Sequence, residues 1–226
     1  MTRKGVPDDV AQIRDGIRAA LNTAYTNGKK VGDSKFGVYA FYDYDGEPIY
    51  VGQTVEKLRT RIRRHLTNHR TDAVAMNVLD PFEVADVEMW PLFDLVGSKE
   101  TIAAALNAAE FAVFQMALAR SRFQAVLNEK DMPTPKKREL FQLPESVRVR
   151  IIPPALFEAR KHPDVRIARR ASTIAALARV ISERDVSRGL RRTLVTQAQR
   201  LEWLARDRFG EFSQDSGLDE DEGGDE

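Results

Sequence analysis

The chain has 226 residues and a net charge of +1, a length that allows one core and a small second unit. Hydrophobic residues make up 42% and charged residues 31%, a composition typical of globular proteins. It holds no cysteine and three histidines, which excludes disulfides and thiolate metal sites and leaves few ligands for zinc. Because no apolar run approaches the roughly 18 residues of a membrane helix and no secretory signal opens the chain, we expect a cytoplasmic protein without membrane contacts.

The first quarter of the chain predicts a helix followed by a β-hairpin. Apolar residues recur at helical spacing over residues 7–26, and Asn27-Gly28 ends the pattern. Two segments rich in β-branched and aromatic residues, 36–42 and 48–51, then flank an Asp/Gly turn. Short strands around such a turn are typical of an antiparallel hairpin.

The middle of the chain adds two helices and a strand. Residues 55–66 are strongly basic with apolar residues four apart, which predicts a helix, and residues 82–89 alternate as a third strand does. Residues 99–121 are rich in alanine and free of Gly and Pro, which predicts a long helix. The fold class expected is α+β: a small three-stranded antiparallel sheet flanked by helices, with an N-terminal helix and a C-terminal helical extension.

The second half of the chain changes character after residue 131. Alternation over residues 147–151 indicates a short strand, and residues 155–209 are helical in pattern, with 13 basic and six acidic side chains. This region is either a helical hairpin packed on the main domain or a module that contacts DNA or forms dimers. The predicted domains are 1–34 (N-terminal helical segment), 35–131 (main domain), 132–154 (linker with a short strand), 155–212 (helical extension) and 213–226 (disordered acidic tail).

The net charge conceals an uneven distribution. The tail, residues 213–226, holds seven acidic and no basic residues, so residues 1–212 carry a charge of +8. A positive body indicates a nucleic-acid-binding protein if its charges gather on one face, although an arginine-rich solvated surface explains the charge equally well. The tail lacks the apolar residues that would offset the entropy of ordering, so we expect it to be disordered.

Two tripeptides on the predicted hairpin, Gly37-Val38-Tyr39 and Tyr50-Val51-Gly52, lie ten residues apart. Each is weak evidence by itself, since a tyrosine in a strand is usually a core aromatic. The residues that follow in chain order strengthen the signal: Leu58, Arg61, His65, Glu110 and Asn128.

Together these positions resemble the GIY-YIG nuclease superfamily. Its two signature tripeptides stand about ten residues apart, an Arg and often a His four residues later follow on the first helix, and a Glu and an Asn come next. The resemblance covers about residues 36–130, and the gap between Gly52 and Arg61 is one residue longer than in typical members. It implies the GIY-YIG fold and the hydrolysis of phosphodiester bonds.

The resemblance also implies the roles of the matched residues. Tyr39 would contact or deprotonate the attacking water, which requires positive neighbours because a phenol has a pKa near 10. Arg61 and His65 are the neighbours expected to supply that charge, and Arg61 would also stabilise charge on the phosphate. Tyr50 would bind the scissile phosphate or position the water. Asn128 would order the site from behind.

The metal and the glycines complete that implied site. Glu110 would be the single protein carboxylate on one Mg²⁺ or Mn²⁺ per active site. Gly37 and Gly52 would allow close backbone packing and a sharp turn from strand to helix.

Residue chemistry supports part of this set independently. Glu110 shares its helix face with apolar residues, and a buried carboxylate there is costly unless it meets a cation or is protonated; the alternative is a helix edge that reaches water. Arg61 and His65 lie one turn apart, and a guanidinium suits a phosphate because its planar fork donates two hydrogen bonds. Basic neighbours expected to contact backbone phosphates, or else to form a solvated face, are Lys57, Arg59, Arg63 and Arg64.

We therefore expect a metal-dependent DNA endonuclease, with a site-specific restriction or defence type as one option. A homodimer is expected if the substrate is palindromic, because one site cuts one strand. Two alternatives stay open: a catalytically silent DNA-binding module with the same fold, and an RNA-directed nuclease.

Overall fold

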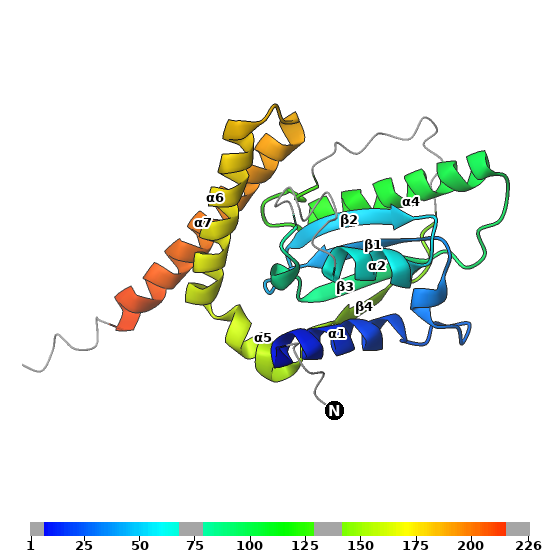
Figure 1. The fold of residues 1–226 in the computed structure, drawn as a ribbon, viewed down its shortest axis with the longest axis horizontal. Coiled ribbons are helices and arrows are strands. Elements are labelled where there is room, and N and C mark those ends of the chain that lie inside the picture. Colours follow the sequence, from blue (N-terminus) through cyan, green and yellow to red (C-terminus); the bar gives the residue numbers. More distant parts are fainter. Residues whose placement is uncertain (1–6, 68–78, 129–141, 216–226) are drawn as a thin grey trace, which may run out of the picture.

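A computed structural model describes residues 7–67, 79–128 and 142–215, which form an antiparallel sheet between helical layers (Figure 1). The predicted hairpin is present as β1 (Gly37–Tyr42) and β2 (Pro48–Thr54), whose turn contains Gly46 at φ +78°. β3 (Asp86–Pro91) pairs with the other edge of β1. The α+β class expected from the sequence is confirmed.

The described sheet has four strands, with the order β2-β1-β3-β4, so the prediction of three strands was wrong. The fourth, β4 (Val147–Arg150), is the short strand predicted within the linker, and its antiparallel pairing with β3 was not predicted. Arg148 and Arg150 both form ion pairs with Asp86, and Arg148 stacks on the ring of Tyr42 with its guanidinium carbon 3.9 Å from the centroid. These contacts hold a short strand that has little apolar surface of its own.

Strand alternation divides the core into two layers. Tyr39 and Phe41 point to the layer that contains α1 (Asp8–Leu21) and α2 (Leu58–Thr67). Val38 and Ala40 point to the opposite layer, which α4 (Lys99–Arg120) covers (Figure 1).

α4 corrects one expectation from the sequence. By length and composition it is able to cross a membrane, so the statement that no apolar run reaches that length was wrong. Alanines between the larger hydrophobic residues keep the helix apolar without an uninterrupted run of large side chains. Leu106, Ala109, Val113 and Ala117 form its buried face against the sheet, as in the core helix of a globular domain.

The C-terminal extension contains α5 (Pro154–Lys161) and the antiparallel pair α6 (Pro163–Glu183) and α7 (Arg188–Asp215) (Figure 1). Buried ion pairs attach the pair to the β1–β2 turn: Arg170 and Arg166 approach Asp43 at 2.6 and 3.4 Å, and all three are nearly inaccessible. Of the alternatives left open for this region, packing on the main domain is the one observed. Contact with DNA and dimer formation stay predictions.

Several element boundaries differ from the predicted ones. α1 ends at Leu21 rather than near residue 26, and β3 begins at Asp86, after a 3-10 turn at Pro81–Glu83. α7 runs to Asp215, so the first three residues of the predicted disordered tail are helical. The rest of the tail, and residues 132–141 of the predicted linker, lie outside the described residues.

Candidate active site

The register of the hairpin brings the two signature tyrosines together. Tyr39 lies opposite Gly52 and Phe41 opposite Tyr50, so both tyrosines leave the same face of the sheet as diagonal neighbours. Their ring centroids are 6.3 Å apart. The hairpin therefore presents two phenols toward α2.

Gly52 is required by the ring of Tyr39. A Cβ at this position would lie 2.7 Å from the Tyr39 hydroxyl and 2.8 Å from a ring carbon of Tyr50. Gly37 is confined in a similar way, because its Cβ would lie 2.9 Å from the carbonyl oxygen of Trp90 and 3.0 Å from Leu58. The two glycines thus make space for the tyrosine pair and for the packing of α2, as expected.

α2 places Arg61 and His65 one turn apart beside the tyrosines. The backbone N–H of Leu58 donates to the carbonyl of Ser34, which fixes the start of the helix. The His65 ring lies 5.9 Å from Tyr39 and 5.2 Å from Tyr50, centroid to centroid. Burial, with the charges of Arg61 and Arg64, lowers the pKa of His65 to about 4. His65 is therefore neutral near pH 7 and does not supply the positive charge that we expected from it.

The hydroxyl of Tyr39 is buried and has no hydrogen-bond partner among the described residues, and neither does Nε of Arg61. Burial and the neighbouring Tyr50 raise the pKa of Tyr39 far above its ordinary value, while Arg61 opposes that shift. In the free protein Tyr39 is a neutral phenol. Arg61 lies close enough to lower the pKa of Tyr39, but neither atom has a partner in hydrogen-bonding geometry within the described part of the chain, so both are available to a ligand.

Glu110 extends from α4 toward the same point. Burial raises the pKa of its carboxyl to about 7, against the lowering effects of the Gln53 backbone N–H and of Arg61. The side chain is half-buried, between the buried and the water-exposed positions considered from the sequence. Its charge raises the pKa of Tyr39 and that of Arg61 lowers the pKa of Glu110, so the three groups lie within electrostatic reach of one another.

A metal ion suits this carboxylate. Within residues 7–67, 79–128 and 142–215 no group of three or more acidic or histidine side chains gathers around a common point, so a site of many protein ligands is absent there. Over the same residues Glu110 forms no ion pair within 4.0 Å. Mg²⁺ commonly keeps several waters and takes one or two carboxylates plus substrate oxygens, which is what a lone carboxylate beside a phosphate site can provide.

The layers meet in a cleft of about 300 Å³ at the end of β2. It is lined by Arg61 from α2, by residues 53–56, and by Ala103, Leu106 and Asn107 from α4. A larger cavity of about 650 Å³ lies between α6 and the Pro81–Glu83 turn, and none of the predicted site residues lines it. Of the two, the smaller cleft is the one that a candidate residue, Arg61, lines.

Asn128 lies at the outer edge of β2. Its side-chain oxygen accepts from the N–H of Val51 at 2.9 Å, and its amide donates to the carbonyl of Val51 at 2.7 Å. The adjacent N–H of Leu127 donates to the carbonyl of Ile49. Residues 127–128 thus cover the outer edge of β2 next to Tyr50.

The four basic residues expected to contact phosphates differ in their surroundings. Arg59 is held by Asp33 at 2.9 Å, and Arg64 forms an ion pair with Glu56 at 2.7 Å. Lys57 lies 3.9 Å from Asp33. Arg63 is exposed and has no carboxylate partner among the described residues, so it is the freest of the four to meet a phosphate.

Residues on α7 support the site, although no pattern in the sequence pointed to them. Thr193 donates to the carbonyl of Leu127, and Arg192 donates to that of Asn128. The buried Arg200 donates to the carbonyls of Pro48 and Ala125. A second missed contact joins Gln53 to Asn107 at 2.7 Å, across the cleft from β2 to α4.

Comparison with known proteins yields one match. The family model described as the GIY-YIG catalytic domain matches residues 35–104. No curated protein and no solved structure matches. The matched range contains both tripeptides, Arg61 and His65, whereas Glu110 and Asn128 lie beyond it and are assigned from their geometry.

Proposed function

The chain belongs to the GIY-YIG nuclease superfamily, and from that premise we propose that it is a divalent-metal-dependent endonuclease that hydrolyses phosphodiester bonds in DNA. The observation that carries the proposal is the convergence of Tyr39, Arg61 and Glu110 from three different elements. Tyr39 and Arg61 each keep a buried polar atom free of the pairing that a purely structural role would give it.

Hydrolysis requires an oriented water, stabilisation of the charge that develops on the phosphate, and neutralisation of the leaving oxygen. Arg61 would donate hydrogen bonds to non-bridging oxygens of the phosphate. The attraction between its positive charge and these oxygens would be strongest in the transition state, when their negative charge is greatest. A divalent cation held by Glu110 would supply Lewis-acid polarisation of the phosphate and stabilise the leaving oxygen.

Tyr39 would contact the attacking water. Because burial keeps its phenol protonated in the free protein, Tyr39 would first orient the water. It would accept a proton from that water only after its phenol had released its own proton to solvent, which requires added positive charge in the substrate complex to lower its pKa. The rings of Tyr50 and neutral His65, which pack together, would form the surface that positions the water and the phosphate.

Plasmid DNA and a structured RNA, each incubated with the purified protein with and without Mg²⁺ or Mn²⁺, test this function. We expect nicking or linearisation of the plasmid that EDTA abolishes. Glu110→Gln and Arg61→Ala should each abolish cutting while circular dichroism and thermal unfolding stay close to wild type. Arg179→Ala, which changes an exposed arginine on α6, is the matched control and should cut normally.

The alternatives predict other results. A silent DNA-binding module would retain DNA without cutting it under any metal, and an RNA-directed nuclease would cut the RNA and spare the plasmid. Wild-type rates in both purified active-site variants would contradict the assignment of residues. Defined fragment ends would support the site-specific type, and sedimentation with a palindromic substrate would test the homodimer.

A further inference from the structure

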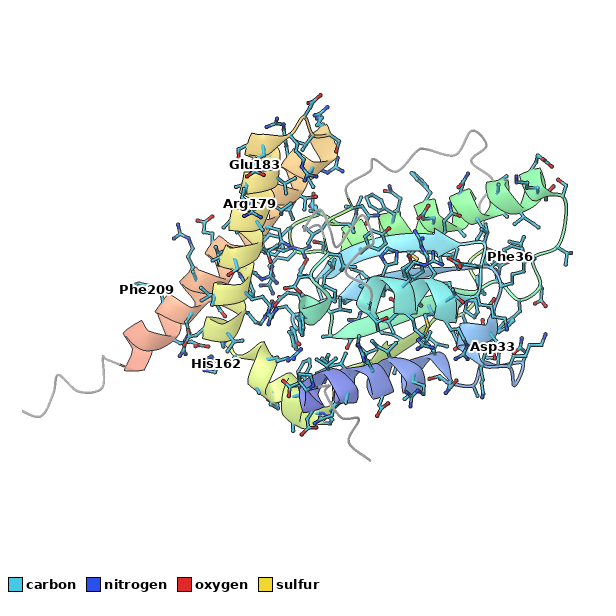
Figure 2. The ribbon with its side chains drawn as sticks, in the orientation of Figure 1. Asp33, Phe36, His162, Arg179, Glu183 and Phe209 are labelled. Atoms are coloured by element: carbon cyan, nitrogen blue, oxygen red, sulfur yellow. The ribbon has the colours of Figure 1, made fainter. Side chains whose placement is uncertain are left out.

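A second basic surface lies at the same end of the sheet as the cleft. It is a pocket of about 590 Å³ lined by Lys29, Lys30, Asp33, Lys35, Phe36, Leu92, Phe93 and Leu95, which we call the lysine pocket. Figure 2 shows Asp33 and Phe36 at the end of the molecule away from the α6–α7 pair, where Arg179 and Glu183 lie.

The three lysines of this pocket are exposed and form no ion pair within the described part of the chain. Two of them are held over aromatic rings: Nζ of Lys29 lies 5.4 Å from the centroid of Phe93, and Nζ of Lys35 lies 5.1 Å from that of Phe36. Cation–π contacts restrict an ammonium without neutralising it. These charges are therefore partly ordered before any ligand arrives.

The backbone that carries Lys29 and Lys30 is also ordered. The N–H of Tyr25 donates to the carbonyl of Lys29, the N–H of Gly28 donates to that of Tyr25, and the Asn27 side chain accepts from the N–H of Lys29. Gly28 takes the positive φ of +74° that this turn requires. Preorganised charges lose less entropy when they bind an anion.

The acidic residue of the pocket is already neutralised. Asp33 pairs with Arg59 at 2.9 Å and lies 3.9 Å from Lys57. Asp94 is exposed beside Phe93 and offsets one of the three lysines. The surface keeps a net positive charge, which favours a polyanion.

The lysine pocket lies near the cleft, although the two share no lining residue. Lys35 precedes Tyr39 by four residues, a span of at most about 13 Å, and the last part of it lies in β1. Gly37, at the start of β1, is paired with Thr54 on one side and with Pro91 on the other, so the cleft and the lysine pocket lie at neighbouring strand ends. At 3.4 Å of axial rise per nucleotide, that distance corresponds to about four nucleotides.

We propose that the lysine pocket binds the sugar-phosphate backbone of the DNA that flanks the scissile phosphate, with Lys29, Lys30 and Lys35 as its phosphate contacts. The proposal rests on the proposed function for the identity of the polyanion. Phe36 and Phe93 act by positioning the ammonium groups rather than by stacking on bases, because Lys35 and Lys29 cover their faces.

The test measures binding separately from cutting. A fluorescein-labelled DNA duplex is titrated in EDTA with the wild type and with the lysine variant, Lys29→Gln/Lys30→Gln/Lys35→Gln. The control is the triple variant Arg14→Gln/Arg179→Gln/Arg206→Gln, which removes the same charge from exposed sites on α1, α6 and α7. If each lysine holds one phosphate, the slope of log affinity against log salt falls by about 2.7 in the lysine variant.

The lysine variant should also cut plasmid more slowly at low enzyme concentration and as fast as the wild type when the enzyme saturates the DNA. Equal affinity and equal slope for the lysine variant and the wild type, or an equal loss in the arginine control, would overturn the inference. A different outcome would contradict only the proposed catalysis: the wild type cuts under no metal, but the salt slope of the lysine variant still differs from that of the wild type. In that case the DNA-binding role of the lysine pocket would still be supported.

Discussion

The side chain of Asn128 and the backbone of Val51 are joined by two hydrogen bonds, one in each direction. β2 is an edge strand of the sheet, and Tyr50 precedes Val51 directly. Asn128 thus replaces the missing neighbouring strand at the position where the site needs a rigid β2. α7 in turn holds the Asn128 segment through Thr193 and Arg192, so the C-terminal helices are part of the support of the active site.

Replacing Asn128 should affect both stability and cutting. Asn128→Ala leaves the buried N–H and carbonyl of Val51 without partners, which costs about 1 to 3 kcal/mol of unfolding free energy. Urea unfolding measures this. Asn107→Ala removes an exposed amide and should cost less than about 0.5 kcal/mol, so equal losses in the two variants would contradict the edge role.

A methyl group at residue 52 should disable the site with the fold retained. In Gly52→Ala the new Cβ meets the Tyr39 hydroxyl at 2.7 Å, so the two tyrosine rings must move, and misplacement of about 1 Å costs about 100-fold in rate. Single-turnover cleavage measures the loss. Gly210→Ala, in α7 with open space around it, is the control and should stabilise the helix by about 0.5 to 1 kcal/mol with normal cutting.

The buried ion pairs of the β1–β2 turn predict a strong dependence on the C-terminal helices. Arg170→Met leaves the buried Asp43 with one arginine, Arg166, besides the backbone N–H groups of its own turn, and we expect a loss of about 3 kcal/mol, the low end of the range for breaking a buried pair. Chemical denaturation of the variant checks this value. Asp43→Asn/Arg170→Met should regain part of it, and Arg179→Met, at an exposed pair, should be nearly neutral.

His65 predicts acid sensitivity of the folded state. Its pKa is about 4 when folded and near 6.5 when unfolded, so the neutral ring stabilises the fold fully above pH 6.5. That stability is lost as the pH falls toward 4, by up to about 1.4 kcal/mol per pH unit. His65→Gln should show a flatter profile than the wild type over this window in urea titrations.

The comparison isolates His65 because Glu83 and Glu110, whose pKa values are raised to about 7, contribute equally to both proteins. His162→Gln changes an exposed histidine and should leave the profile as it is in the wild type. Parallel profiles for His65→Gln and the wild type would show that His65 is already protonated or accessible to water.

Replacing two arginines of α2 should have different effects: one on the stability of the fold and the other on DNA binding. Arg59→Ala removes contacts with Asp33, Asn22 and the carbonyl of Leu21, so it should lower stability by about 1 kcal/mol or more. Arg63→Ala should leave stability unchanged and reduce the salt slope of DNA binding by about 1. Thermal unfolding and anisotropy together distinguish them, and a reversed pattern would contradict the contacts seen.

The sequence by itself determined the parts of the site that depend on local periodicity. Strand alternation and the spacing of the tripeptides put Tyr39 and Tyr50 on one face of a hairpin, and helical spacing put Arg61 and His65 on one side of a helix. These relationships follow from the fixed geometry of strands and helices, so neighbouring residues are enough to predict them.

The remaining features of the site depend on contacts between residues that are distant in the chain, and only the folded structure shows them. Arg59 is occupied by Asp33, His65 is neutral, a fourth strand joins the sheet, and α7 supports Asn128 from 65 residues away through Thr193 and Leu127. Burial and long-range pairing set the charge and freedom of a side chain, and neither leaves a repeating pattern in the sequence.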